Sequence, residues 1–182
     1  RVIFVDPGVA DYQSLIAHAG TSATIVVLDA HTDGVGQIHD YLINSNGLIS
    51  TVDIISHGEA GVLYLGSTTL SCHNIAQYEG LLSDIGHQLT QDANILLYGC
   101  YVAAGQAGQR FIDRLAELTG TDVAASTNLT GAATLGGDWV LEAVSTDGEV
   151  RADALQIPAY QGALVTITGN SWNSATTYNE QS

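Results

Sequence analysis

The sequence predicts a mixed α/β fold, a three-layer sandwich in which helices flank a mostly parallel, six-stranded sheet. Short apolar runs alternate along the chain with amphipathic stretches of about ten to fifteen residues, which is the pattern of βαβ units. Right-handed crossovers between parallel strands then place helices on both faces of the sheet. The chain has 182 residues, of which 46% are hydrophobic, so it is long enough to form one domain with a sizeable core.

The first half of the chain contains three of the expected strands, each a short apolar run bounded by polar residues or glycine. They cover residues 2–5, 24–28 and 52–56. Apolar residues at helical spacing predict one helix over 12–20 and a second over 35–43. Asp33 precedes the second helix and is the candidate for its N-cap.

The second half continues the same alternation. Residues 61–70 alternate around Gly66 and predict a hairpin, after which Ser71 is expected to cap a helix that runs to Leu89. The remaining expected elements are a strand at 94–98, a helix at 105–119, a strand at 123–126, a loop at 127–137, a sixth strand at 139–144 and a further strand at 163–168. Residues 1–165 should therefore form one domain, followed by a linker or C-terminal tail at 166–182.

The charge of the chain is strongly negative. It has 19 acidic residues against four arginines and no lysine, which gives a net charge of −15. Such a surface repels nucleic acid and anionic membranes, so we expect no nucleic-acid partner. No apolar run approaches the ~18 residues of a membrane-spanning helix, so we expect no membrane insertion either. Divalent cations would be attracted, and the loop 29–33 is a candidate for calcium, although no EF-hand motif is present and no cofactor is certain.

Two reactive side chains follow neighbouring strands of the predicted sheet. Ser56-His57-Gly58 follows the third strand and Gly99-Cys100 follows the fourth. Parallel strands lie about 4.8 Å apart and end at one edge, where such sheets bind ligands. We therefore expect Cys100 to act as a nucleophile with His57 as its acid or base. The backbone N–H of Gly58 and those of the following helix would stabilise an oxyanion, and the helix would lower the pKa of the thiol.

Structural interpretations of both residues remain open from the sequence alone. Buried free cysteines are common, a disulfide could join Cys72 to Cys100, and a lone histidine at a strand end often has a structural role. Zinc binding is not indicated, because Cys72 and His73 are adjacent and lack a second spaced pair. A nucleophile elbow is not indicated either, because Cys100 lacks the glycine that this motif needs two residues before and after it.

The order of these motifs resembles that of the caspase-like cysteine peptidases of clan CD, in which a histidine-glycine pair precedes a cysteine behind a small residue. Residues 52–61, 98–105, 123–128 and 136–142 are similar to an uncharacterised caspase-like domain near the N-terminus of very large bacterial adhesin, cadherin-like and RTX-type proteins. The resemblance covers about residues 1–165. It implies a caspase-like peptidase domain with a His57/Cys100 dyad, in a secreted or cell-surface bacterial protein.

The expected function is that of a cysteine endopeptidase that cuts its own parent chain or a neighbouring domain. The chain begins at Arg1 and contains no methionine, so we expect it to be a piece of a longer protein. The alternative is a non-catalytic module that serves as a folded cap or interaction domain of an adhesin. A catalytic Cys100 should alkylate far faster than Cys72.

Three residues are candidates for the substrate pocket. Arginine-specific relatives often carry an aspartate two residues before the cysteine, where this chain has Tyr98. Asp6 ends the first strand and could place a carboxylate at the pocket mouth, but it is equally suited to a turn. Asp138, beside Trp139, is the third candidate, and simple solvent exposure is its alternative.

Overall fold

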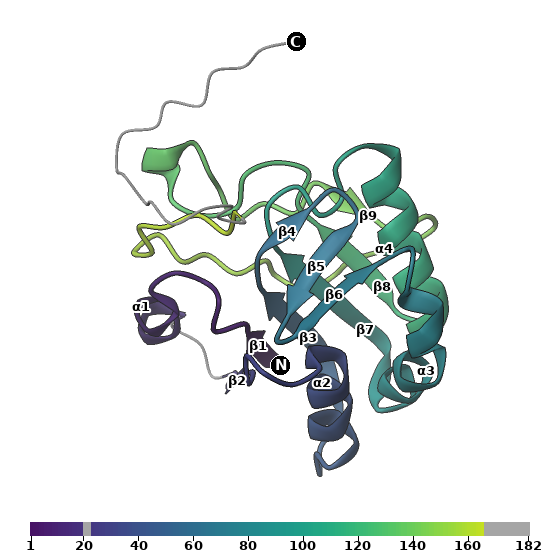
Figure 1. Ribbon diagram of the computed structural model, residues 1–182. Coiled ribbons are helices and arrows are strands. Elements are labelled where there is room, and N and C mark those ends of the chain that lie inside the picture. Colours follow the sequence, from purple (N-terminus) through teal and green to yellow (C-terminus); the bar gives the residue numbers. More distant parts are fainter. Residues whose placement is uncertain (20–22, 166–182) are drawn as a thin grey trace.

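The protein is described by a computed structural model that covers residues 1–19 and 23–165, and it has a mixed α/β fold built on a six-stranded sheet (Figure 1). The strand order is β2-β1-β3-β7-β8-β9. The first five strands are parallel, and β9 runs antiparallel to β8. The strands are β1 (Val2–Val5), β2 (Thr24–Val27), β3 (Ile49–Ile55), β7 (Leu89–Tyr98), β8 (Asp122–Ala125) and β9 (Ala143–Val144).

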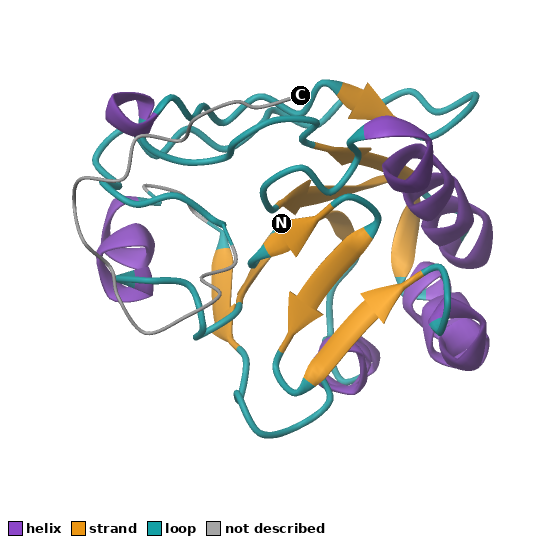
Figure 2. Ribbon diagram, turned by 45° about the horizontal axis from the view of Figure 1, so that its top comes forward, coloured by secondary structure: helices purple, strands orange, loops and turns teal. Residues whose placement is uncertain are grey.

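Two hydrophobic cores lie on opposite faces of this sheet, because side chains alternate along a strand. In β1, Phe4 belongs to one core and Ile3 to the other; in β7, Leu97 and Leu96 divide in the same way. The helices α2 (Gly34–Ile43), α3 (Glu79–His87) and α4 (Gly105–Thr119) cover the first face, and α1 (Tyr12–His18) helps to cover the second. Figure 2 shows α1 across the strands from α3 and α4. This arrangement is consistent with the predicted three-layer sandwich.

A second, three-stranded antiparallel sheet lies over the first core. It consists of β4 (Gly58–Glu59), β5 (Val62–Leu65) and β6 (Thr68–Ser71). The predicted hairpin is therefore confirmed, and its turn contains Gly66 with a φ of +59°. A side chain at Gly66 would also collide with the carbonyl of Thr32, so the turn needs a glycine for two reasons.

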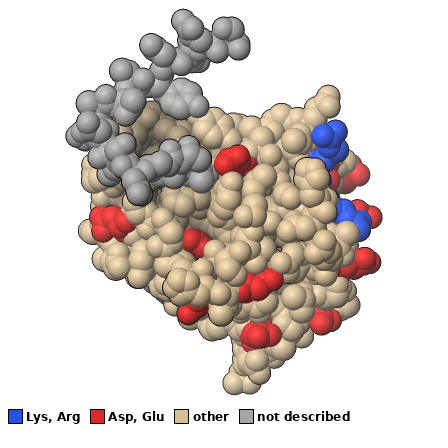
Figure 3. All heavy atoms as spheres, in the orientation of Figure 1, with Lys and Arg blue, Asp and Glu red and all other residues tan. Residues whose placement is uncertain are grey.

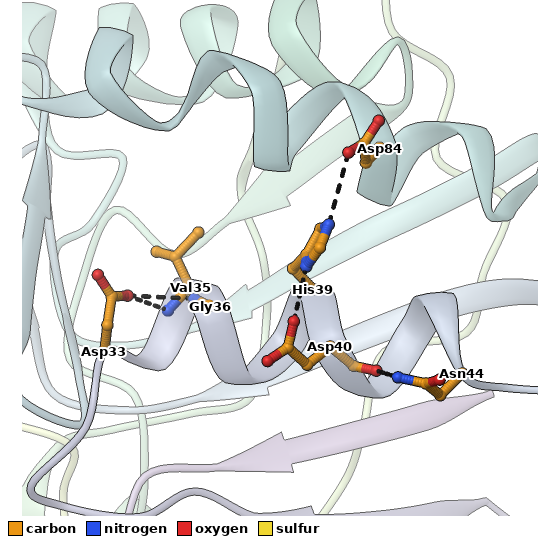
Figure 4. Close-up of polar contacts among 7 residues, drawn as sticks. All are labelled: Asp33, Val35, Gly36, His39, Asp40, Asn44 and Asp84. Atoms are coloured by element: carbon orange, nitrogen blue, oxygen red, sulfur yellow. Dashed lines mark hydrogen bonds and ion pairs between the residues drawn. The ribbon is translucent and has the colours of Figure 1, made fainter.

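The start of α2 follows the prediction. The Asp33 carboxylate accepts hydrogen bonds from the N–H groups of Val35 at 2.8 Å and Gly36 at 3.1 Å, so Asp33 is the N-cap of this helix (Figure 4). Further along α2, Nε2 of His39 lies 3.5 Å from a carboxylate oxygen of Asp84. Since Asp84 belongs to α3, this contact joins the two helices.

Three predicted boundaries were wrong. Ser71 is the last residue of β6 rather than a helix cap, and a 3₁₀ turn (Ile75–Tyr78) precedes α3. Leu89 begins β7 instead of ending the helix, because its side chain packs into the first core from the sheet. Only the last two residues of the predicted strand 139–144 are paired, and Trp139 is instead buried in the second core.

The C-terminal predictions are met only in part. Within the predicted strand 163–168, Ala163 and Val165 form isolated β-bridges, while residues 166–168 and the expected linker 166–182 lie outside the described residues. In the described part of the chain, no helix has the length and apolar character needed to span a membrane. The face shown in Figure 3 carries many acidic side chains and few basic ones, as the composition implies.

Candidate active site

The loops that follow β3 and β7 lie against one another. The N–H of Ser56 donates to the carbonyl of Tyr98 at 3.0 Å, which continues the parallel pairing to the strand ends. A Cβ atom on Gly58 would lie 3.1 Å from the carbonyl oxygen of Cys100 and 3.3 Å from the carbonyl carbon of Gly99. The absence of a side chain at Gly58 therefore lets the histidine loop and the cysteine loop meet at one edge of the sheet.

His57 is held in one orientation by a backbone carbonyl. Its Nε2 atom lies 2.9 Å from the carbonyl oxygen of Gly8. Because a carbonyl can only accept a hydrogen bond, Nε2 carries the proton and Nδ1 of the neutral ring has the free lone pair. Nδ1 is buried and has no hydrogen-bond partner among the described residues. The fold thus presents an imidazole nitrogen that can accept a proton.

Asp6 supports this histidine indirectly. One oxygen of its carboxylate accepts from the N–H of Gly8 at 2.7 Å, and the other accepts from the N–H of Gly66 at 2.6 Å. These bonds correspond to the turn role that the sequence left open for Asp6. They fix the turn that contains Gly8, whose carbonyl in turn orients His57.

Cys100 is fully buried, and its sulfur contacts the backbone of Thr130. The thiol donates to the Thr130 carbonyl at 3.5 Å, and the Thr130 N–H donates to the sulfur at 3.3 Å. Burial raises the pKa of the Cys100 thiol to about 11. The expected lowering by a helix N-terminus does not prevail, since α4 begins only at Gly105. Cys72 is exposed and both cysteines are free, so no disulfide removes the thiol.

The C-terminal part of the chain returns to this edge of the sheet. The N–H of Cys100 donates to the carbonyl of Leu164 at 3.5 Å, and the N–H of Leu164 donates to the carbonyl of Thr130 at 2.9 Å. Gly58 forms a parallel β-bridge with Val165. Both loops of the candidate site are therefore in contact with residues 164 and 165.

The other pocket candidates have their polar atoms engaged within the chain. The buried Tyr98 hydroxyl accepts from the N–H of Leu155 at 2.6 Å, and burial raises its pKa. The half-buried Asp138 carboxylate accepts from the N–H of Val140 at 2.9 Å and from the Asn128 amide at 3.3 Å. Each of these side chains holds a local turn or a neighbouring segment in place.

The carboxylates of the loop 29–33, which was the candidate for calcium, accept hydrogen bonds from backbone N–H groups. Asp29 accepts from the N–H of His31 at 2.7 Å, and Asp33 caps α2. Among the described residues, no group of three or more His, Cys, Asp or Glu side chains is arranged to hold a metal ion.

Three residues at this edge were not identified from the sequence: Gly8, Thr130 and Leu164. Gly8 and Thr130 contribute backbone atoms, and a backbone role leaves no mark in the residue type. Thr130 lies within a stretch expected to be an irregular loop. Leu164 was expected in a strand, and its apolar side chain fitted a core position equally well.

Comparison with known proteins adds a family but no activity. No curated protein matches this sequence. A family described as "Domain of unknown function (DUF4347)" matches residues 2–164, which include both loops of the candidate site. The match spans most of the chain, and the protein therefore belongs to the DUF4347 family.

Proposed function

We propose that this domain is a caspase-like cysteine endopeptidase in which Cys100 is the nucleophile and His57 the general base. It would process its own parent chain or a neighbouring domain of a large, secreted or cell-surface bacterial protein. The observation that carries the proposal is the state of His57. A carbonyl holds Nε2 as the donor, and the buried Nδ1 is left without a partner in the described chain. The next residue, Gly58, packs against the loop that carries Cys100.

An unpartnered, buried ring nitrogen costs free energy in a folded protein, on the order of 1–3 kcal/mol. Such a cost is expected where a group must exchange protons with a substrate. The structural alternative for His57, a satisfied core histidine, would give both ring nitrogens a partner. The geometry therefore favours a catalytic role over a purely structural one.

The buried Cys100 thiol needs such a base. With a pKa of about 11 it is protonated at neutral pH, and only the thiolate is a strong nucleophile. Transfer of its proton to Nδ1 of His57 as the sulfur attacks would remove this difficulty. The N–H of Cys100 already donates to a carbonyl oxygen, which is the contact that an oxyanion would need.

The burial of Cys100 is also what a non-catalytic domain would show. Cys100 is 0% exposed, and its sulfur has two backbone contacts, as expected for a structural cysteine. In that case the domain would be a folded cap or interaction module of a larger surface protein. Loss of Cys100 would then change stability but no reaction.

The test compares the full chain with two site variants and two matched controls. Each protein is incubated with a peptide mixture, and new peptide termini are identified by mass spectrometry. Cys100→Ala should abolish cleavage, and His57→Ala should slow it by about 10²–10⁴-fold. The controls Cys72→Ala and His73→Ala change the other cysteine and an exposed histidine, and they should leave the rate unchanged.

Melting temperatures show whether each variant is folded. Cleavage that persists in folded Cys100→Ala would place the activity elsewhere. Absence of cleavage of the peptides and of the chain itself, in every protein tested, would favour the non-catalytic module.

A further inference from the structure

We propose that residues 162–165 are bound at the site as the domain's own substrate, and that Cys100 cleaves the bond between Leu164 and Val165. This inference rests on the proposed peptidase function and names its substrate. It is carried by the backbone contacts of the segment, the burial of the Leu164 side chain and the position of the Leu164 carbonyl.

The segment pairs with the chain as an added strand. Gly131 and Ala163 form an antiparallel β-bridge. On either side of it, the N–H of Leu164 donates to the Thr130 carbonyl at 2.9 Å, and the N–H of Ala132 donates to the Gly162 carbonyl at 2.8 Å. Extended peptides are commonly recognised in this way, with backbone bonds for affinity and side-chain positions for specificity.

The Leu164 carbonyl lies where the attacked group should lie. Its oxygen accepts a 3.5 Å hydrogen bond from the N–H of Cys100, the residue that would attack it. On the other side of the bond, Val165 forms a parallel bridge with Gly58, the residue next to His57. The peptide bond between Leu164 and Val165 is therefore bracketed by the two motifs of the candidate site.

The sulfur lies beside the same peptide. The Thr130 carbonyl accepts from both the Cys100 thiol, at 3.5 Å, and the Leu164 N–H, at 2.9 Å. One carbonyl thus holds the nucleophile and the residue to be attacked. Once the sulfur leaves its two contacts with the Thr130 backbone, of 3.5 Å and 3.3 Å, it can turn toward the Leu164 carbonyl.

The Leu164 side chain defines the substrate class. It is 0% exposed and belongs to the second core, together with Tyr98, Trp139 and Tyr160. A leucine-sized apolar side chain before the cleaved bond fits this environment, whereas a lysine or arginine there would place a charge in an apolar core. Asp6 and Asp138, the acidic pocket candidates, already accept hydrogen bonds from the chain itself.

The reaction needs only water as co-reactant. The Cys100 sulfur bonds to the Leu164 carbonyl carbon as its proton passes to Nδ1 of His57, and the Cys100 N–H holds the oxyanion. Collapse breaks the bond to the Val165 nitrogen, which takes the proton from His57 and leaves as an amine. Water then attacks the Leu164 thioester, His57 takes its proton, and the thiol is restored with Leu164 as a carboxylate.

The experiment uses the full chain and follows the fragment that begins at Val165, by intact mass and N-terminal sequencing. The chain should release this fragment at a rate that does not depend on protein concentration, because enzyme and substrate are one molecule. Cys100→Ala should release none, and Cys72→Ala should match the unmodified chain. Leu164→Met keeps an apolar side chain and should cleave at a similar rate, whereas Leu164→Asp should be slower by roughly 10–200-fold or more.

A second arm separates this inference from the peptidase function itself. An internally quenched peptide that copies residues 160–167 is given to the Leu164→Asp chain, in which the segment is expected to leave the site. Melting temperature checks that this variant folds, and Leu164→Ala replaces it if it does not. Cleavage of the peptide after leucine, dependent on Cys100, together with release of the Val165 fragment by the unmodified chain, is the expected result.

Other outcomes overturn the inference in distinct ways. Cleavage of the peptide without self-cleavage would retain the peptidase and reject the inference that residues 162–165 are cut within their own chain. Cys100-dependent self-cleavage at another bond would reject the bond assigned here. Absence of both reactions in folded protein would reject the inference together with the proposed peptidase function.

Discussion

The Cys100 sulfur combines two properties that oppose each other. It follows β7, as the proposed nucleophile should, yet it is fully buried, and burial raises its pKa to about 11. From the sequence, a catalytic Cys100 is expected to alkylate far faster than Cys72. The described geometry reverses that expectation, because residues 164 and 165 contact both loops of the site.

With residues 162–165 in place, we therefore predict that iodoacetamide modifies the exposed Cys72 first and Cys100 much more slowly. Because the pKa of the Cys100 thiol is raised to about 11, its rate of modification should rise steadily as the pH is raised from 7 to 10. Peptide mapping after timed alkylation between pH 7 and pH 10 measures both rates. Equal rates at pH 7 would show that the site is open.

Gly58 is a residue whose size is tightly restricted at the site. A Cβ atom there would collide with a methyl group of the buried Val102 and lie 3.1 Å from the Cys100 carbonyl oxygen. We predict that Gly58→Ala lowers the free energy of unfolding by about 1–3 kcal/mol, as overpacking does. Urea denaturation measures this, and adding Val102→Ala should recover part of the loss.

Gly80 provides the control for that substitution. It lies in the exposed first turn of α3, and a Cβ atom there would meet nothing within 4 Å. Gly80→Ala should therefore stabilise the protein slightly, by up to ~1 kcal/mol. If Gly58→Ala were as harmless as Gly80→Ala, the close packing of the two loops would be in doubt.

At the scale of elements, one buried ion pair links the start of β1 to β3. Arg1 binds the Asp53 carboxylate through two hydrogen bonds of 2.6 Å, and Asp53 is 0% exposed in the middle of β3. Burial raises the pKa of Asp53, and this effect outweighs the lowering by the neighbouring guanidinium. The guanidinium nevertheless provides both of the hydrogen bonds recorded for this buried carboxylate, and the N-terminal ammonium adds a second favourable charge.

We predict that Arg1→Met lowers the free energy of unfolding by about 3–5 kcal/mol near neutral pH, because it leaves a buried carboxylate unpaired. When folding raises the pKa of a carboxyl, the protonated carboxyl stabilises the folded state. This contribution is complete below the pKa of the unfolded state and is lost as the pH rises through the pKa of the folded state. The deficit of the variant should therefore shrink as the pH falls toward 4. Urea denaturation at several pH values measures it.

The exposed pair between Arg151 and Glu149 provides the control for this measurement. Arg151→Met should change the free energy of unfolding by no more than about 0.5 kcal/mol, since surface pairs contribute little. Equal effects of Arg1→Met and Arg151→Met would contradict the assigned role of the buried pair.

At the scale of the whole molecule, residues 150–165 form a C-terminal strap. The strap packs across the second face of the sheet and reaches the candidate site. Its anchors come from distant parts of the chain. The Asn94 amide oxygen accepts from the N–H of Ala152 at 3.0 Å, the Tyr98 hydroxyl accepts from that of Leu155, and the Tyr160 hydroxyl donates to the Ala10 carbonyl at 2.9 Å. Release of the strap should therefore affect both stability and the site.

Tyr98→Phe tests this coupling. It leaves the buried N–H of Leu155 without its acceptor, so we predict a loss of about 1–3 kcal/mol in the free energy of unfolding. Because the strap also covers Cys100, alkylation of Cys100 should become faster. Tyr101→Phe, at a side chain that is 43% exposed, is the control and should change neither quantity. A stability loss without faster alkylation would mean that the strap and the site are not coupled.

The sequence by itself determined the order of strands and helices and the placement of two reactive motifs on adjacent strands. These features depend on local periodicity and on the regular geometry of parallel sheets, so apolar runs ending at His57 and Cys100 were sufficient to predict them. Ser71 and the strand at 139–144 were mispredicted where a local pattern competed with packing. Trp139 is apolar enough for a strand but is buried in the second core as part of an irregular segment.

Only the tertiary structure decided which groups contact the side chains of His57 and Cys100. The carbonyl that orients His57 comes from 49 residues away, and the backbone that holds the Cys100 sulfur comes from 30 residues away. Both partners are backbone atoms, which every residue type carries, so no pattern of side chains marks them in advance. The return of Leu164 to the same edge has the same origin, because its position is set by the packing of the strap over the whole second core.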